Sequence, residues 1–279
     1  MDSRQLFVAF GPQVYRVVRP WGETPPTIKL GIISKCAVDR AGNLYICQRA
    51  DPPVIVYDDK GRFARAFGDG AIVDAHGIFV TADDRVLVVD RDGHQVMCFD
   101  SRGHLLFALG ERTRPRFQAP FSHPTDVAVG PSGDIYVTDG YGNTMVHRFS
   151  ADGQFRNSWG GFGSGPGQFT TPHGIKVLTD GRVLVGDREN NRLQVFDPAG
   201  RYLTEWRGFY HPMDIHVHEE MVYVTDQVPR VVALRSDGTM VGACKPVLTL
   251  GHGMSGDRAG HLYFVETRTT IITRLEPVT

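Results

Sequence analysis

A pattern of short apolar segments separated by turn residues recurs six times along this 279-residue chain. The clearest copy lies within residues 172–200, where HGIKVL, RVLVGD and RLQVFD read as strands and Thr179-Asp180-Gly181 supplies the first turn. The copies start 39 to 49 residues apart, which is the period of a propeller blade. Their first residues are Ser34, His76, Thr125, His173, Met213 and His252.

A sheet of about four short antiparallel strands cannot bury both of its faces alone, so each copy needs neighbours of the same kind. The sixth copy lacks its last strand. Residues 13–22, QVYRVVRPWG, match the last strand of the third copy, FRNSWG, and we expect them to complete the sixth blade. The sequence therefore predicts an all-β, six-bladed β-propeller closed by an N-terminal strand, with residues 1–279 as a single domain.

The composition argues against several kinds of partner. The net charge is -1, the pI is near 6.8 and no run of lysines or arginines occurs, so binding to nucleic acid or to an anionic membrane has no electrostatic support. The first residues lack the apolar core of a signal peptide, and no segment approaches the length of a membrane span. Cys36, Cys47, Cys98 and Cys244 show no CxxC spacing. We expect a cytoplasmic protein, and the oligomeric state is left open.

Histidine occupies the first position of every second copy, at His76, His173 and His252. In a ring of six blades, alternate blades stand about 120° apart and the innermost strands line the central channel. Three imidazoles can therefore converge on one point, as in a three-histidine zinc site with an open fourth position. The alternative is three hydrogen-bonded core histidines beside the channel. The pattern favours a metal site for Zn²⁺ or another divalent transition metal.

A second column of residues marks the end of the second strand in each copy, and acids fill most of it. We expect these side chains to accept backbone N–H bonds in the turn that follows. The column consists of Gln48, Asp90, Asp139, Asp187, Asp226 and Glu266.

Residues just past this column share a rim of the ring with the three histidines, because the first two strands of a blade are antiparallel. Tyr141 lies there beside one extra residue, and such an irregularity commonly re-aims a side chain. A tyrosine beside a cation can serve as a base, although an aromatic wedge between blades explains Tyr141 equally well. Arg49 and Arg188 place guanidinium groups on this rim that suit a carboxylate, and the alternative is two solvated surface arginines. Arg91 adds a third cation to the rim.

The repeats resemble NHL repeats from about Gln13 to Pro277. Three passages, PTDVAVGPSGDIYVTDGYGN, GSGPGQFTTPHGI and GDRENNRLQVF, are similar to the catalytic core of peptidyl-α-hydroxyglycine α-amidating lyases. That family is a six-bladed propeller that binds zinc through three histidines and cleaves a carbinolamide into an amide and glyoxylate. The resemblance implies the same fold, a zinc cofactor and a small-molecule substrate that bears a carboxylate.

The same resemblance implies roles for individual residues. It makes Tyr141, in the DGYGN motif, the base that takes the substrate hydroxyl proton. It makes Arg188 and Arg49 the active-site arginines. The implied zinc ligands are His76, His173 and His252.

The chain departs from that family at several positions. The family holds a structural calcium ion in its channel, largely through backbone carbonyls, which here would belong to Cys36 and Ile78. The family's acidic residue after the last zinc histidine is Gly253 here, and Ca²⁺ is a second candidate ion. The family's cysteine after the catalytic tyrosine is Gly142, so the secretory disulfide is absent. The peptide part of the substrate is therefore left open.

Three classes of function are consistent with the sequence. The first is a zinc-dependent lyase that cleaves the C–N bond of an α-hydroxylated amide. The second is a metal-dependent hydrolase or lactonase, because a three-histidine zinc could instead activate water. The third is a non-catalytic NHL interaction propeller, which predicts no bound metal and a sizeable exposed apolar or basic patch.

Overall fold

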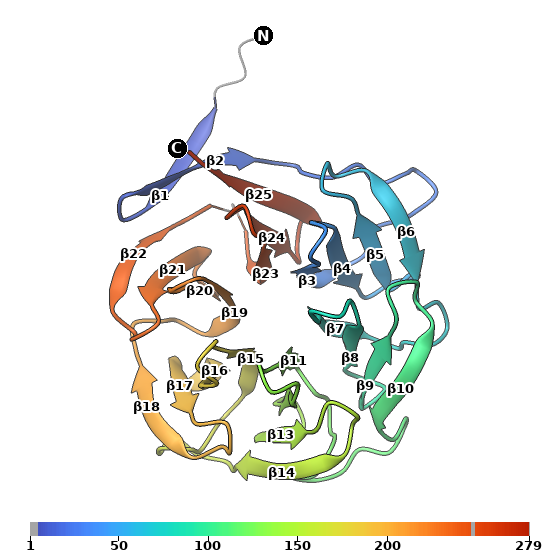
Figure 1. The fold of residues 1–279 in the computed structure, drawn as a ribbon, viewed down its shortest axis with the longest axis vertical. Coiled ribbons are helices and arrows are strands. Elements are labelled where there is room, and N and C mark those ends of the chain that lie inside the picture. The colour runs from blue at the N-terminus through green and yellow to red at the C-terminus, as the bar shows by residue number, and fades with distance from the viewer. Residues whose placement is uncertain (1–4, 247–248, 279) are drawn as a thin grey trace.

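The predicted six-bladed β-propeller is confirmed by a computed structural model of the chain, which describes residues 5–246 and 249–278. Six antiparallel sheets surround a central channel (Figure 1), and the innermost strand of each sheet faces that channel. In the described residues the one helix is the short 3-10 segment η1 (Arg188–Asn190). Within the same residues, no helix is both long enough and apolar enough to cross a membrane.

Blades one to five are four-stranded meanders whose strands run outward from the channel in chain order. Blade one is β3 (Ile33–Val38), β4 (Leu44–Gln48), β5 (Val54–Tyr57) and β6 (Phe63–Phe67); blade two is β7 (Ala75–Val80), β8 (Val86–Asp90), β9 (Gln95–Phe99) and β10 (Leu105–Gly110). Blade three is β11 (Asp126–Val129), β12 (Ile135–Asp139), β13 (Met145–Phe149) and β14 (Phe155–Gly160). Blade four is β15 (Pro172–Val177), β16 (Val183–Asp187), β17 (Arg192–Phe196) and β18 (Tyr202–Trp206); blade five is β19 (Pro212–His218), β20 (Met221–Asp226), β21 (Arg230–Arg235) and β22 (Met240–Cys244).

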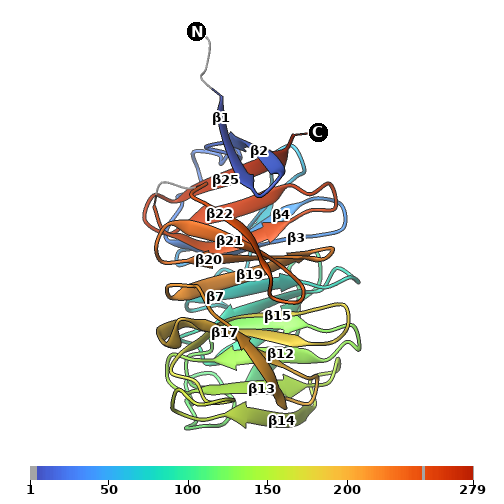
Figure 2. The same ribbon diagram turned by 90° about the vertical axis from the view of Figure 1, so that its left-hand side faces the viewer.

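The sixth blade closes the ring with strands from both ends of the chain. Its inner strands are β23 (Gly251–Gly256), β24 (Leu262–Glu266) and β25 (Ile271–Pro277). As predicted, β2 (Gln13–Val18) pairs with β25, with Val17 opposite Leu275. A fifth strand, β1 (Leu6–Phe10), adds outside β2 and was not predicted. Figures 1 and 2 show β1, β2 and β25 together at one edge of the ring.

The hydrophobic core lies between neighbouring blades. Each apolar cluster of the described residues combines side chains from two adjacent sheets, as where Leu184 and Val195 of blade four meet Ile215 and Val224 of blade five. A sheet with a neighbour on each face is buried on both faces, so its second strand needs no polar alternation. This explains apolar strands such as β8, VLVVD, which is buried along its whole length. Each fully buried Val or Leu side chain contributes ~1.5–3 kcal/mol, so neighbouring blades stabilise one another.

The mostly acidic side chains at the ends of the second strands accept backbone hydrogen bonds, as predicted, but the predicted donors are wrong. These side chains mainly accept N–H groups from the segment that enters the same blade, 16 or 17 residues earlier, rather than from the following turn. Antiparallel pairing brings that entering segment beside the end of the second strand. Asp90 additionally accepts the N–H of Gly93, in the turn that follows. The donor and acceptor pairs are Gly31 with Gln48, Asp74 with Asp90, Ser122 with Asp139, Thr170 with Asp187, Tyr210 with Asp226 and Thr249 with Glu266.

Candidate metal centre

Three histidines from alternate blades meet at the hub of the propeller. His76, His173 and His252 are the second residues of β7, β15 and β23, and their ring centroids lie 5.1 to 5.2 Å apart. All three are buried, and their potential ligand nitrogens lie within 4.8 Å of one another. The geometric prediction made from the alternating column is therefore met: these three side chains could form a metal site.

A local irregularity turns each of these histidines into the channel. The pairing of the first two strands slips at this point in each of the three blades, between Ala75 and Gly77 in blade two. Such a bulge re-aims the side chain that it contains. A glycine follows each histidine, and a Cβ on Gly174 would lie only 2.7 Å from the carbonyl oxygen of Met213. The His-Gly pair thus lets the next inner strand approach closely while the imidazole points at the hub.

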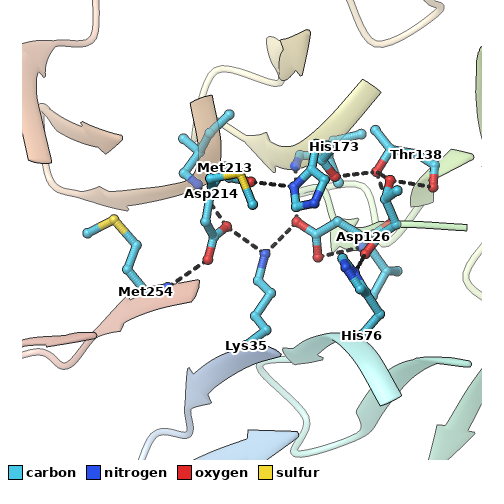
Figure 3. Close-up of polar contacts among 12 residues, drawn as sticks. Lys35, His76, Asp126, Thr138, His173, Met213, Asp214 and Met254 are labelled. Carbon is cyan, nitrogen blue, oxygen red and sulfur yellow. Dashed lines mark hydrogen bonds and ion pairs between the residues drawn. The ribbon is translucent and has the colours of Figure 1, made fainter. Parts of the chain in front are cut away.

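Hydrogen bonds fix the orientation of all three imidazoles. The Nδ1 atom of each ring donates to a backbone carbonyl at 2.7 Å, from the residue that starts the next blade's repeat. The bond from His173 to Met213 is drawn in Figure 3. Because Nδ1 carries the proton, the Nε2 lone pair is free to bind a ligand. The acceptors for His76, His173 and His252 are the carbonyls of Thr125, Met213 and Ser34.

Burial keeps these imidazoles neutral. It lowers the pKa of His252 to about 4, and it holds the pKa values of His76 and His173 well below the usual range. Repulsion from the neighbouring imidazole of His252 lowers the pKa of the other two further. A neutral imidazole is the form that binds a metal ion, so the site is ready to accept one near pH 7.

The unsatisfied lone pairs at the hub fit a cation. The hydroxyl oxygen of Tyr141 lies 3.1 Å from His76 Nε2 and 3.0 Å from His173 Nε2. A tyrosine has one hydroxyl proton, so it can donate to only one of these two acceptors. Within the described residues, His252 Nε2 accepts no hydrogen bond. Three neutral nitrogen donors that face one point suit Zn²⁺ or a similar divalent transition metal.

Tyr141, predicted to share the rim with the histidines, reaches His76 and His173 with its hydroxyl oxygen. The carbonyl of Pro172 lies 2.0 Å from the position that a Cβ on Gly140 would take, so the residue before Tyr141 must be glycine. The N–H of Tyr141 donates to the carbonyl of His123 at 3.3 Å. These contacts with the segments that enter blades three and four hold the tyrosine over His76 and His173. Tyr141 is 38% exposed, so the ring is accessible from the rim.

Three arginines surround the tyrosine and the histidines. The guanidinium carbons of Arg188 and Arg91 lie 5.4 and 5.8 Å from the centre of the Tyr141 ring, within cation–π range. Arg188 Nη1 also donates to the Tyr141 hydroxyl oxygen at 3.4 Å. The positive charge of Arg49 is close enough to lower the pKa of His76 and of His252. Arg188 and Arg91 are also paired with Glu189 and Asp92, so the rim offers guanidinium donors beside the hub rather than net positive charge.

The sequence analysis missed Asp74, which links two of these arginines. Its Oδ2 accepts a hydrogen bond from Arg91 Nη2 at 2.8 Å, and its Oδ1 lies 3.4 Å from Arg49 Nε. That Nε atom is buried and makes no hydrogen bond within the described residues. Asp74 lies two residues before His76, and the corresponding positions of the other five copies hold no acid. A comparison of this position across the six copies would have shown Asp74 as a charged exception.

Comparisons with known proteins agree with this architecture. The NHL repeat family matches residues 121–149 and 169–196. Human NHL repeat-containing protein 3 is 32% identical over 213 residues, which cover 71% of this chain and 61% of that protein. A probable peptidyl-alpha-hydroxyglycine alpha-amidating lyase of Caenorhabditis elegans is 35% identical over 135 residues, or 47% of this chain and 39% of that protein. The chain thus spans less than two thirds of the length of these relatives.

A solved structure shares the fold. A gluconolactonase of Xanthomonas campestris, XC5397, superposes with a TM-score of 0.73 over 95% of this chain and 90% of that chain, at 14% identity. Such low identity shows a common architecture and nothing about the reaction. The chain is therefore a six-bladed β-propeller in which residues 121–149 and 169–196 match the NHL repeat family. Within that class it resembles the peptidyl-α-hydroxyglycine α-amidating lyases.

Proposed function

We propose that the chain is a metal-dependent carbon–nitrogen lyase that cleaves an α-hydroxylated amide into an amide and glyoxylate, or a related carbonyl acid. The observation that carries this proposal is the position of Tyr141. Its hydroxyl oxygen lies within hydrogen-bond distance of His76 and His173 and beside Arg188. A proton acceptor, a metal-binding hub and a cation are thus grouped within reach of one substrate carbon.

His76, His173 and His252 would hold Zn²⁺ or another divalent transition metal, which would supply Lewis acidity at the substrate hydroxyl. The phenolic oxygen of Tyr141 is the acceptor of the hydroxyl proton. The electron pair of the O–H bond then forms the new C=O bond while the C–N pair leaves with the nitrogen. The nitrogen takes a proton back from Tyr141, so the residue returns to its starting form and no water is consumed. Arg188 donates toward the tyrosine oxygen and offsets negative charge there.

Arg49 and Arg188 are proposed to bind the carboxylate next to the reacting carbon. Arg49→Met is therefore expected to raise KM by ~10–100-fold, which corresponds to the loss of one charge-assisted hydrogen bond. Steady-state kinetics with N-benzoyl-α-hydroxyglycine measure this change. A matched substrate with methyl in place of the carboxylate is the control, and the native protein and the variant should use it equally poorly. An unchanged KM for the carboxylate substrate would contradict this role for Arg49.

The proposed reaction is tested with the purified native chain. We expect a stoichiometric transition metal by elemental analysis, and equal amounts of benzamide and glyoxylate from N-benzoyl-α-hydroxyglycine. Chelation should abolish turnover and added zinc should restore it. Hydrolysis of lactones with no glyoxylate release would favour the metal-dependent hydrolase instead. Absence of both metal and turnover would leave a non-catalytic NHL scaffold.

A further inference from the structure

A second alternating pattern lies one residue deeper in the channel than the three histidines. The residue after each histidine is glycine, and the corresponding residues of blades one, three and five are charged. These are Lys35 on β3, Asp126 on β11 and Asp214 on β19, the channel trio. Their side chains are only 12%, 3% and 2% exposed. Figure 3 shows Lys35 reaching between the two carboxylates, near His76 and His173.

The ammonium group of Lys35 joins the two acids. It donates to Asp126 Oδ2 and, at 2.6 Å, to Asp214 Oδ1. The acids also accept backbone N–H groups from neighbouring blades, of Ile175 at 3.0 Å and of Met254 at 2.7 Å. The channel trio therefore links the inner strands of blades one, three, four, five and six. Two buried carboxylates without a cation would be strongly destabilising. Lys35 is the cation that bonds to both of them, and the charge of buried Lys176 acts on them without a direct bond.

The resemblance to amidating lyases raises the question of a calcium ion at this depth, and the residues present do not fit one. The carboxylate oxygens that calcium would need are already bonded to Lys35. The cavity bounded by the histidines and the channel trio measures about 10 Å³, at the lower limit for one water molecule. A Cβ on Gly253, where the family has an acid, would lie 2.5 Å from Lys35 Cα. An acidic side chain there would clash with the strand that carries the lysine.

We infer that the Lys35 ammonium replaces a divalent cation in the channel, so that the fold is independent of calcium and carries a latent calcium site beneath the lysine. Replacing Lys35 with alanine removes the ammonium and the three carbons beyond Cβ, and it leaves two buried carboxylates and the space between them. Carboxylate oxygens are the ligands that calcium prefers, and two negative charges match one divalent ion. This inference does not depend on the proposed reaction, because its measurements are calcium content and thermal unfolding.

The test compares the native protein with Lys35→Ala and Lys35→Met, at a fixed zinc concentration, with and without added CaCl₂. The native Tm should not respond to calcium. Lys35→Ala should lower Tm by roughly 10 °C without calcium, because two buried charges lose their partner. Calcium at about 100 times its Kd should then raise Tm by roughly 5 °C. Lys35→Met is the matched control: it removes the charge but fills the space, so calcium should not restore its Tm.

Three results would overturn the inference. One is stoichiometric calcium in the native protein after gel filtration in calcium-containing buffer. Another is a folded Lys35→Ala protein whose Tm is insensitive to calcium. The third is an equal response in Lys35→Ala/Asp214→Asn, which lacks one of the two carboxylates. If Lys35→Ala does not fold, the native protein still tests whether Lys35 replaces calcium. Bound calcium, or a native Tm that rises with calcium, would contradict the inference.

Discussion

Replacing His173 with alanine is expected to release the metal ion and to lower turnover by ~10³-fold, the value of several kcal/mol of Lewis-acid stabilisation. Loss of a residue that merely supports a metal ligand costs 10–100-fold in affinity, so loss of a ligand should cost at least ~100-fold. Elemental analysis of the purified variant and kinetics with N-benzoyl-α-hydroxyglycine measure the two effects. Extra zinc should recover little activity, because only two of the three imidazoles would remain to bind it.

The histidine variant needs a control for general damage. His173→Ala also removes the donor to the Met213 carbonyl, which costs about 1–3 kcal/mol of stability, so thermal unfolding should accompany the metal analysis. His216→Ala is the matched control, because His216 is equally a buried histidine of an inner strand but lies near the far end of β19. It should keep its metal and its turnover. Full metal occupancy in His173→Ala would contradict the three-histidine site.

The repeat predicted the fold because a spacing of 39 to 49 residues between similar four-strand units is typical of a propeller. Turn residues recur at a blade's spacing, and the second strands are apolar throughout because neighbouring blades cover both faces. The extra strand β1 escaped this reasoning. It belongs to no repeat, and most of it is exposed. What anchors it is Phe10, which packs edge-to-face against Tyr15 and, across the blade boundary, against Tyr223.

The same period placed the site residues but not their partners. Position within a repeat determines which side chain faces the channel, so His76, His173 and His252 could be predicted to converge. The partner of a side chain depends on the relative heights of neighbouring blades, which the period does not specify. The ion pairs of Lys35 with two acids were missed for this reason. Asp74 differs, because its charge stands out when the copies are compared and only its arginine partners depend on the fold. The donors predicted for the acidic column are wrong because antiparallel pairing brings the entering segment, and not the following turn, beside the end of the second strand.

Replacing Tyr141 with phenylalanine is expected to lower kcat by ~10²–10⁴-fold while the metal stays bound, because general base catalysis contributes that factor. The variant keeps the ring that lies against Arg91 and Arg188 and removes only the hydroxyl that reaches His76 and His173. KM should change little, since the proposed carboxylate contacts lie on the arginines. Kinetics and elemental analysis on the same preparation separate these effects.

The control for this variant is Tyr210→Phe. Tyr210 is an exposed tyrosine in the segment that enters blade five, on the same rim, and its ring stacks on His211 rather than on the hub histidines. Tyr210→Phe, which also loses a hydroxyl, should keep the native kcat and metal content. Turnover of Tyr141→Phe within tenfold of the native value, with metal bound, would remove Tyr141 from the role of base. Loss of metal from Tyr141→Phe would instead make the tyrosine oxygen a ligand, and the proton acceptor would then have to be sought elsewhere on the rim.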